Sequence, residues 1–164
     1  MYTKEDLKEY LKAMGLTGKE TILVHSSMKS IGEVEGRADT VLDAWIEYFG
    51  HGLLLLPTHT WKNINADSPV YNPKETPSCV GLLTNMFLKR DGVIRSLHPT
   101  HSMAGIGEKA AEYLAGDTDS SSMPIARNAS VISISAPSSP QIPIQMPFLC
   151  ALSAAILIRR SRSL

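Results

Sequence analysis

Three short polar segments contain most of the side chains able to do chemistry, and the first two each follow an apolar run. His25-Ser26-Ser27 follows the run at residues 21–24, and Thr58-His59-Thr60 follows the run at residues 53–57. The third segment extends from Arg95 to Ser102 and contains two histidines. Imidazoles can act as bases near neutral pH, while hydroxyls and a guanidinium can hold anionic oxygens. These residue types predict a site for a phosphate or carboxylate group, with candidate bases beside it.

The first polar segment continues into a loop that leads to a long predicted helix. This loop contains Gly32 and Gly36. Backbone N–H groups at such a junction, together with the helix dipole, suit phosphate oxygens. The loop could therefore hold the pyrophosphate of a nucleotide or of coenzyme A; a turn eased by glycine ahead of an ordinary helix is the alternative. Neither G-x-G-x-x-G nor G-x-x-x-x-G-K is present, so it is not a Rossmann or Walker motif.

Metal and hydrolase chemistry have less support from residue spacing. His98 and His101 could form a metal pair, but Pro99 breaks helical geometry and no third ligand stands at a recognisable spacing. We therefore expect no metal, and a metal-dependent hydrolase would have to use this pair. Ser26 beside His25 suggests a nucleophile and its base, yet neighbours along a strand point to opposite faces. No G-x-S-x-G motif is present either.

Several residues of the polar segments have both a functional and a structural interpretation. Arg95 and Ser96 suit a phosphate or carboxylate, but Arg95 could instead pair with an acidic neighbour. Trp61 and Tyr71 lie in polar loops near strand ends, where they could line a substrate cleft or merely cover the loop. Together with Thr60, they are the candidate substrate contacts.

Apolar periodicity predicts the elements that position these segments. Thr3 and Asp6 form a capping box ahead of a first helix that ends at Gly15. A longer helix extends from Ala38 to Gly50, between the two apolar runs that precede the polar segments. Strand, helix and strand in this order form a right-handed crossover with parallel strands.

The same alternation continues to residue 115. The sequence predicts a helix capped by Thr76 with Pro77 in its first turn, strands at residues 93–95 and 101–106, and a short helix at residues 108–115. The predicted fold is therefore α/β, a three-layer sandwich with a mostly parallel sheet. Ligands of such sheets bind outside the carboxyl ends of the strands, which is where the polar segments fall.

Composition divides the chain into two portions. Residues 1–119 contain all 16 acidic residues and all 11 glycines, and their net charge is −4. Residues 120–164 contain four arginines but no glycine and no acidic residue. Folded α/β chains need glycine at turns and helix ends, so this second portion is atypical. We expect one domain over residues 1–119, followed by a tail that is either a linker with an add-on or an out-of-frame continuation.

Composition also narrows the class of protein. A formal net charge of zero gives no indication of nucleic-acid binding. The apolar run at residues 148–158 is shorter than the about 20 residues that cross a membrane. Only two cysteines, Cys79 and Cys150, and an N-terminus without a signal-peptide pattern indicate a cytoplasmic protein. The expected partner is therefore a small molecule rather than a nucleic acid or a membrane.

Four segments in register resemble the aminoglycoside 3-N-acetyltransferase family. They are LVHSSMKSIGEVEG at residues 23–36, LLLPTHT at residues 54–60, NPKETPSCVG at residues 72–81 and GVIRSLHPTHS at residues 92–102. In that family acetyl-CoA donates its acetyl group to the 3-amino group of a 2-deoxystreptamine aminoglycoside. The resemblance implies acetyl-CoA as cosubstrate and a set of coenzyme contacts, namely His25, Ser26, Ser27, Ile31, Gly32, Val34, Gly36, Arg95, Ser96, His98 and Ser102.

The chain departs from the family pattern in two places. Family members commonly have two glycines where this chain has Gly36-Arg37. Their catalytic histidine comes from an Asn-Thr-Ser-x-His-type motif, which residues 120–164 do not contain. The catalytic residues are therefore unknown, and we expect a truncated or frame-disrupted enzyme that is inactive in this form. A coenzyme A or nucleotide-binding module without catalysis is the alternative.

Overall fold

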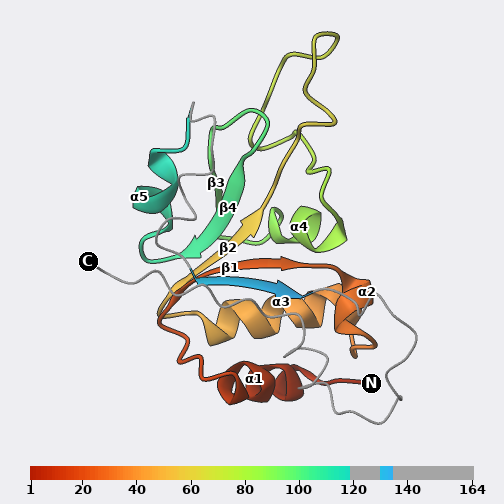
Figure 1. Cartoon of the computed structure of the whole chain (residues 1–164), viewed down its shortest axis with the longest axis vertical. Helices are drawn as coiled ribbons and strands as arrows, with labels where there is room; N and C mark the ends of the chain where they lie inside the picture. The colour runs from red at the N-terminus through yellow and green to blue at the C-terminus, as the bar shows by residue number, and fades with distance from the viewer. Residues whose placement is uncertain (119–129, 135–164) are drawn as a thin grey trace.

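A five-stranded sheet forms the centre of the protein, for which a computed structural model describes residues 1–118 and 130–134. The strands are β1 (Thr21–Ser26), β2 (Leu53–Pro57), β3 (Ile94–Arg95), β4 (Met103–Gly107) and β5 (Ser130–Ile134). The helices are α1 (Lys4–Ala13), α2 (Met28–Ile31), α3 (Arg37–Tyr48), α4 (Leu82–Phe87) and α5 (Ala110–Ala115). Helices and strands alternate along the chain, which confirms the predicted α/β class (Figure 1).

The sheet is mixed, with strand order β3-β4-β2-β1-β5. β1 is parallel to both β2 and β5, whereas β4 is antiparallel to both β2 and β3. The parallel pair β1–β2 needs the long crossover that α3 provides. By contrast, β3 and β4 are joined by the short segment of residues 96–102, which suffices for antiparallel neighbours.

Helices cover both faces of the sheet, as a three-layer sandwich requires (Figure 1). Side chains alternate along β2, so Leu54 and Leu56 pack into a core with α1, α3 and α4, while Leu53 and Leu55 pack with α5. This two-sided burial explains why the β2 sequence is continuously apolar instead of alternating.

The ends of α1 follow the sequence prediction. Thr3 and Asp6 form the capping box, and Gly15 adopts a left-handed conformation just beyond the helix. Lys4 and Lys8 both pair with Glu47 of α3, which fastens α1 on the outer side of α3. Two partly exposed pairs of this kind contribute little free energy compared with the apolar contact beneath them.

The helix predicted to begin at Thr76 begins only at Leu82, which corrects the sequence prediction. Hydrogen bonds to the end of β2 hold the intervening residues in a loop. The Cys79 N–H donates to the His59 carbonyl oxygen at 2.8 Å, and the Ser78 hydroxyl donates to the same oxygen at 3.1 Å. Thr76 does not cap a helix, because its hydroxyl accepts the Asn72 N–H at 2.9 Å.

β5 lies within the portion that composition set apart as an atypical tail. Its backbone pairs with β1 in five register positions, from Ile22↔Ser130 to Ser26↔Ile134. These residues therefore belong to the sheet, and the division at residue 119 stays a prediction. Among the residues that the structure describes, no helix is both long and apolar enough to span a membrane.

Candidate functional site

The second and third polar segments meet at the carboxyl edge of β2. The Thr58 N–H donates to the Ser102 carbonyl oxygen and the Thr60 N–H donates to the Thr100 carbonyl oxygen, both at 2.9 Å. These bonds continue the β2–β4 ladder past its regular end. The first segment ends β1, the parallel neighbour of β2, so the three segments share one edge as predicted.

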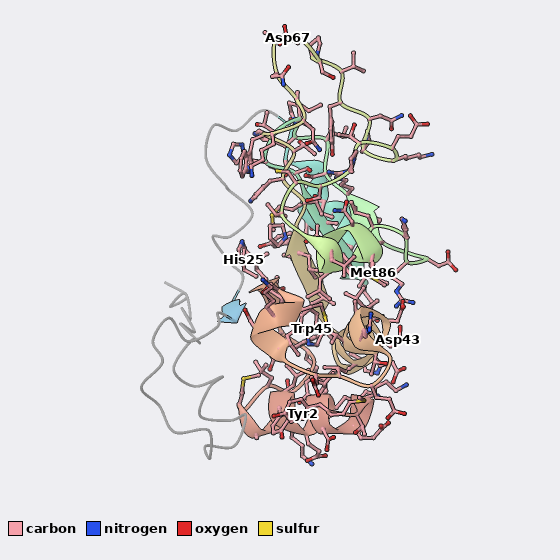
Figure 2. The ribbon with its side chains drawn as sticks, turned by 90° about the vertical axis from the view of Figure 1, so that its right-hand side faces the viewer. Tyr2, His25, Asp43, Trp45, Asp67 and Met86 are labelled. Atoms are coloured by element: carbon pink, nitrogen blue, oxygen red, sulfur yellow. The ribbon has the colours of Figure 1, made fainter. Side chains whose placement is uncertain are left out.

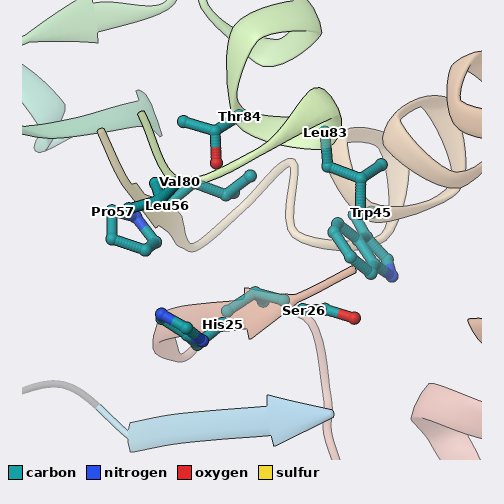
Figure 3. Close-up of a pocket in the computed structure, with 9 residues that line it drawn as sticks. His25, Ser26, Trp45, Leu56, Pro57, Val80, Leu83 and Thr84 are labelled. Atoms are coloured by element: carbon teal, nitrogen blue, oxygen red, sulfur yellow. The ribbon is translucent and has the colours of Figure 1, made fainter. Parts of the chain in front are cut away.

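A small cleft separates the end of β1 from β2 and α4 (Figure 3). His25 and Ser26 line one side of it, and Leu56, Pro57 and Thr84 line the other. Its interior volume is about 10 Å³, which is room for about one water molecule. The cleft therefore marks where β1 and β2 diverge, but a ligand of coenzyme size has to bind across its rim.

The connection from β1 to α3 has an unusual backbone. Ser27 caps the short helix α2, and its hydroxyl accepts the Ser30 N–H at 3.3 Å. Gly32 and Gly36 then have φ angles of 95° and 70°, values that favour glycine. A Cβ at Gly36 would collide with the Thr40 hydroxyl. Both glycines are exposed, and no side chain within the described ranges caps the N-terminus of α3.

Arg37 occupies the first position of α3 with φ of 55°, which makes it the non-glycine residue with positive φ in the described part of the chain. The left-handed conformation is unfavourable for a residue with a Cβ. This positive φ explains why glycine suits the position better than arginine. The Arg37 side chain is exposed, so its guanidinium adds a positive charge at the start of the helix.

Tyr2 holds this connection in place, a role that sequence reasoning missed. The Tyr2 N–H donates to the Glu33 carbonyl oxygen at 2.8 Å, and the Glu35 N–H donates to the Tyr2 carbonyl oxygen at 2.9 Å. The Tyr2 ring lies against Gly32 and stacks edge-on against Tyr10 of α1. Because these contacts are long-range and mostly made by the backbone, no sequence motif indicated them.

Arg95 makes several internal hydrogen bonds, so its predicted contact with an anion stays a prediction. Its Nη2 donates to the Thr58 carbonyl oxygen at 2.7 Å, and its Nε lies 3.2 Å from the Thr58 and Ser102 hydroxyls. Its Nη1 donates to the carbonyl oxygens of Pro73 and Thr76. Burial lowers the pKa of the guanidinium, although arginine remains protonated at physiological pH. Within the described residues, the hydrogen-bond partners of the Arg95 guanidinium are hydroxyl and carbonyl oxygens rather than an acidic side chain.

Ser96 and Ser102 are also interior residues rather than ligand contacts. Ser96 is 2% exposed; its hydroxyl donates to the Asp117 carboxylate and accepts the Met103 N–H at 2.9 Å. Ser102 is fully buried, and its hydroxyl donates to the Thr58 carbonyl oxygen at 2.8 Å. The two hydroxyls stabilise the turn into β4, so their predicted contact with coenzyme is not supported.

The three candidate substrate contacts lie in different environments. Thr60 is fully buried and its hydroxyl donates to the Pro99 carbonyl oxygen, so its predicted substrate contact stays a prediction. Tyr71 donates to the Ser96 carbonyl oxygen at 2.9 Å and its ring lies against the Arg95 guanidinium, so it covers the loop. Burial raises the Tyr71 pKa. Trp61 is 47% exposed and is the member of the three that faces solvent.

The remaining predicted coenzyme contacts divide by exposure. Ile31 and Val34 have buried side chains that pack in the core, so only their backbones could reach a ligand. His98 is nearly buried, and its Nδ1 accepts the N–H groups of Thr100 and His101. The residues of the predicted set that face solvent or the cleft are His25, Ser26, Ser27, Gly32 and Gly36. The accessible site is therefore the β1–α3 connection.

His59 is a second residue that sequence reasoning did not assign. Its ring lies 5.3 Å from the His101 ring, measured between centroids, and His101 lies 5.5 Å from His98. Burial lowers the His59 pKa below its ordinary value of 6.5, and the neighbouring imidazoles add to this effect. The described residues contain no group of three or more side chains suited to hold a metal ion.

The fold and this edge define a class: an α/β protein whose accessible polar groups gather at a glycine-containing strand-to-helix connection. Comparison with known families then identifies it. The family model for aminoglycoside 3-N-acetyltransferase matches residues 23–131, so the chain belongs to that family of acyltransferases. The matched range contains all the segments on which the resemblance rested.

Individual relatives agree with this assignment. The SPbeta prophage-derived aminoglycoside N(3')-acetyltransferase-like protein YokD of Bacillus subtilis (strain 168) is 32% identical over 133 residues, covering 68% of this chain and 49% of YokD. The solved structure of AAC-VIa bound to sisomicin has a TM-score of 0.72 at 23% identity, covering 80% of this chain and 59% of the other.

A further solved structure, AAC-IIIb in binary complex with CoASH, has a TM-score of 0.62 at 21% identity and covers 70% of this chain and 49% of the other. At these identities the two structural matches establish the fold. The chain spans about half the length of the curated relatives it matches.

Proposed function

We propose that this chain carries the coenzyme-binding portion of an aminoglycoside 3-N-acetyltransferase. The activity in question moves an acetyl group from acetyl-CoA to the 3-amino group of a 2-deoxystreptamine aminoglycoside, which confers antibiotic resistance. The observation that carries the proposal is the β1–α3 connection, where Gly32 and Gly36 are exposed and left-handed.

The chemistry of this connection suits a pyrophosphate. The first N–H groups of α3 have no partner within the helix, and the helix dipole adds positive potential at the same place. Gly36 allows a phosphate to approach the backbone without obstruction by a Cβ. Arg37 adds a fixed positive charge at this end of the helix, and the hydroxyls of Ser26 and Ser27 can donate to further oxygens.

The relatives support the identity of both ligands. One solved relative binds CoASH and another binds sisomicin, an aminoglycoside. Trp61, exposed beside the carboxyl edge, is the candidate substrate contact of this chain. We propose a cytoplasmic location, because a content of only two cysteines is typical of proteins from a reducing compartment.

Transfer of the acetyl group requires a base, because the substrate ammonium must lose a proton before its nitrogen attacks the thioester carbonyl. The thiolate of coenzyme A then leaves, and donors must stabilise the oxyanion formed between these steps. His98 does not suit the role of base, since its Nδ1 already accepts two N–H groups. The resemblance assigns the base to an Asn-Thr-Ser-x-His motif, which this sequence does not contain, so we propose binding without turnover.

Calorimetric titration of the full chain tests the proposal. Coenzyme A is expected to bind with one site per chain, dephospho-coenzyme A to bind comparably, and adenosine to give no heat, because the pyrophosphate is the recognised group. Equal binding of AMP would favour a nucleotide-binding module instead. An acetylation assay with acetyl-CoA and sisomicin is expected to show no product, and product formation would contradict the absence of a base.

A pair of glycine variants localises the binding. Gly36→Ala and Gly15→Ala both place a Cβ on a left-handed backbone, but Gly15 lies beyond α1, and a Cβ there meets nothing within 4 Å. Gly15→Ala is expected to lose about 1 kcal/mol of stability from the left-handed backbone alone, and Gly36→Ala should lose more, because its Cβ also meets the Thr40 hydroxyl. Only Gly36→Ala should weaken coenzyme binding; equal affinities in the two variants would contradict the proposed site.

A further inference from the structure

Histidines gather on one face of the sheet at its carboxyl edge. Because Leu23 and Leu55 face α5, alternation along the strands directs His25 and His59 to that same face. His101 lies directly opposite His59 in the extension of the β2–β4 ladder that the Thr58 and Thr60 N–H groups maintain. The His59–His101 and His98–His101 ring contacts link three imidazoles in a continuous chain.

The turn that carries this cluster is built around a deprotonated nitrogen. His98 Nδ1 accepts the Thr100 N–H at 3.2 Å and the His101 N–H at 3.0 Å. A proton on Nδ1 would replace this acceptor with a donor and remove both bonds. The shape of the turn of residues 98–101 therefore depends on His98 Nδ1 as a hydrogen-bond acceptor.

His59 is equally unsuited to a positive charge. Within the described ranges, its Nδ1 is the buried side-chain nitrogen or oxygen without a hydrogen-bond partner. The titratable groups acting on it are imidazoles, namely His101 and His98 of the adjoining turn and His25 of β1. Two other titratable side chains belong to elements nearby. Cys79, on the loop before α4, donates its backbone N–H to the His59 carbonyl oxygen, and the carboxylate of Asp117, which follows α5, accepts a hydrogen bond from Ser96. A charged His59 would thus face other imidazoles, and burial together with these rings outweighs the backbone hydrogen bond with His101 that favours the charged form.

We propose that His59 is a positioning residue that, through its ring contact with His101, holds the segment of residues 96–102 against β2 only while the His59 imidazole is uncharged. Protonation of His59 introduces repulsion between its ring and the adjacent imidazole of His101. The segment then separates from β2, and the edge loses its order as the pH falls through the His59 pKa, which burial holds below 6.5. Where coenzyme binding is the readout, this inference rests on the proposed function.

Hydrogen exchange of the ligand-free full chain tests the proposal without any ligand. After correction for the intrinsic pH dependence of exchange, the protection of the Thr58 and Thr60 amides should fall at least about tenfold between pH 7.5 and pH 5.5. A difference of one pKa unit between the attached and separated states of the segment would change the equilibrium between them by this factor. Amides that join β1 to β2 serve as the internal control and should keep their protection. Unchanged protection of Thr58 and Thr60 would overturn the proposal.

Variants separate positioning from general acid instability. His59→Gln cannot take up a proton and is expected to retain protection at pH 5.5, and His101→Gln should behave in the same way. A fall in both variants equal to that of the wild type would overturn the proposal. If neither variant folds, an NMR titration of the His59 imidazole in the wild-type protein tests the proposal instead. A titration midpoint at or above pH 6.5 would contradict the proposal.

Coenzyme titrations at both pH values distinguish this inference from the proposed function. With wild type, the coenzyme A Kd should rise at least about threefold more between pH 7.5 and pH 5.5 than with His59→Gln, which cancels the titration of the ligand itself. No binding at pH 7.5 would reject the proposed function and leave the exchange result as the test of the cluster. Binding with the same pH response in both proteins would overturn the link between cluster and ligand.

Discussion

The Arg95 guanidinium donates a hydrogen bond from Nη2 to the Thr58 carbonyl oxygen at 2.7 Å, and this contact joins edge strand β3 to the chain leaving β2. The same side chain reaches the carbonyl oxygens of Pro73 and Thr76 in the long loop that projects from the sheet (Figure 1). In Figure 2, Asp67 marks the tip of that loop, at the opposite end of the molecule from Tyr2. One half-buried cation thus organises several backbone segments.

Removing the Arg95 charge should destabilise the fold more than it affects any ligand. Arg95→Met removes the hydrogen bonds that the guanidinium donates to the carbonyl oxygens of Thr58, Pro73 and Thr76, and the free energy of unfolding should fall by about 3 kcal/mol. Arg95→Lys keeps the charge but not the forked geometry and should lose less. Urea denaturation measures both. Unchanged stability with lost coenzyme binding would restore Arg95 to the ligand site.

Ser96 and Ser26 should give opposite results when each is replaced by alanine. Ser96→Ala removes the hydroxyl that donates to the buried Asp117 carboxylate and accepts the Met103 N–H, so stability should fall by about 2 kcal/mol. Ser26→Ala, at the partly exposed rim of the cleft, should change stability by less than about 0.5 kcal/mol but weaken coenzyme binding severalfold. Thermal melts and calorimetry of both variants provide the comparison; the reverse pattern would mean that the burial-based assignment is mistaken.

Replacing Arg37 with glycine should stabilise the fold while weakening the ligand site. The left-handed φ of 55° is unfavourable for arginine, and its relief outweighs the extra chain entropy of glycine by about 0.5 kcal/mol. Arg37→Ala keeps the strain, so it should show no gain and serves as the control for lost charge. Both variants should bind coenzyme A less tightly. A destabilised Arg37→Gly would indicate that the side chain makes a stabilising contact.

Stability should decline on acidification in a window set by His59. The His59 pKa in the folded protein lies below 6.5, so the unfolded chain takes up a proton first as the pH falls. The free energy of unfolding is therefore highest above pH 6.5 and decreases as the pH falls through the folded pKa, below which both states are protonated. The loss is about 1.4 kcal/mol for each pKa unit of difference. Melts of wild type and His59→Gln at several pH values isolate this contribution, which should be absent in the variant.

The sequence predicted those features that local physical chemistry determines. The capping box at Thr3 and Asp6, the end of the first helix at Gly15 and the two buried strands before the polar segments all depend on residues close in sequence. The shared edge of the three segments followed from a general property of strand-helix-strand units. Apolar periodicity likewise placed α3 to within a residue at its N-terminus.

The sequence could not predict which polar residues are accessible. Arg95, Ser96 and Thr60 have residue types suited to ligand binding, but backbone groups distant in sequence use their hydrogen-bonding capacity. The late start of α4 has the same origin, because the end of β2 holds residues 78 and 79 in a loop. Long-range satisfaction of backbone groups thus overrides local preference at each of these positions.

Backbone amide chemical shifts during a coenzyme A titration test the central claim most directly. Addition of coenzyme A to the isotope-labelled full chain at pH 7.5 should shift the amide resonances of residues 26–38, with the largest changes at Gly32 and Gly36 and little change in α1 or α5. Shifts centred instead on Arg95 and Ser96, or no shifts at saturating coenzyme, would contradict the account.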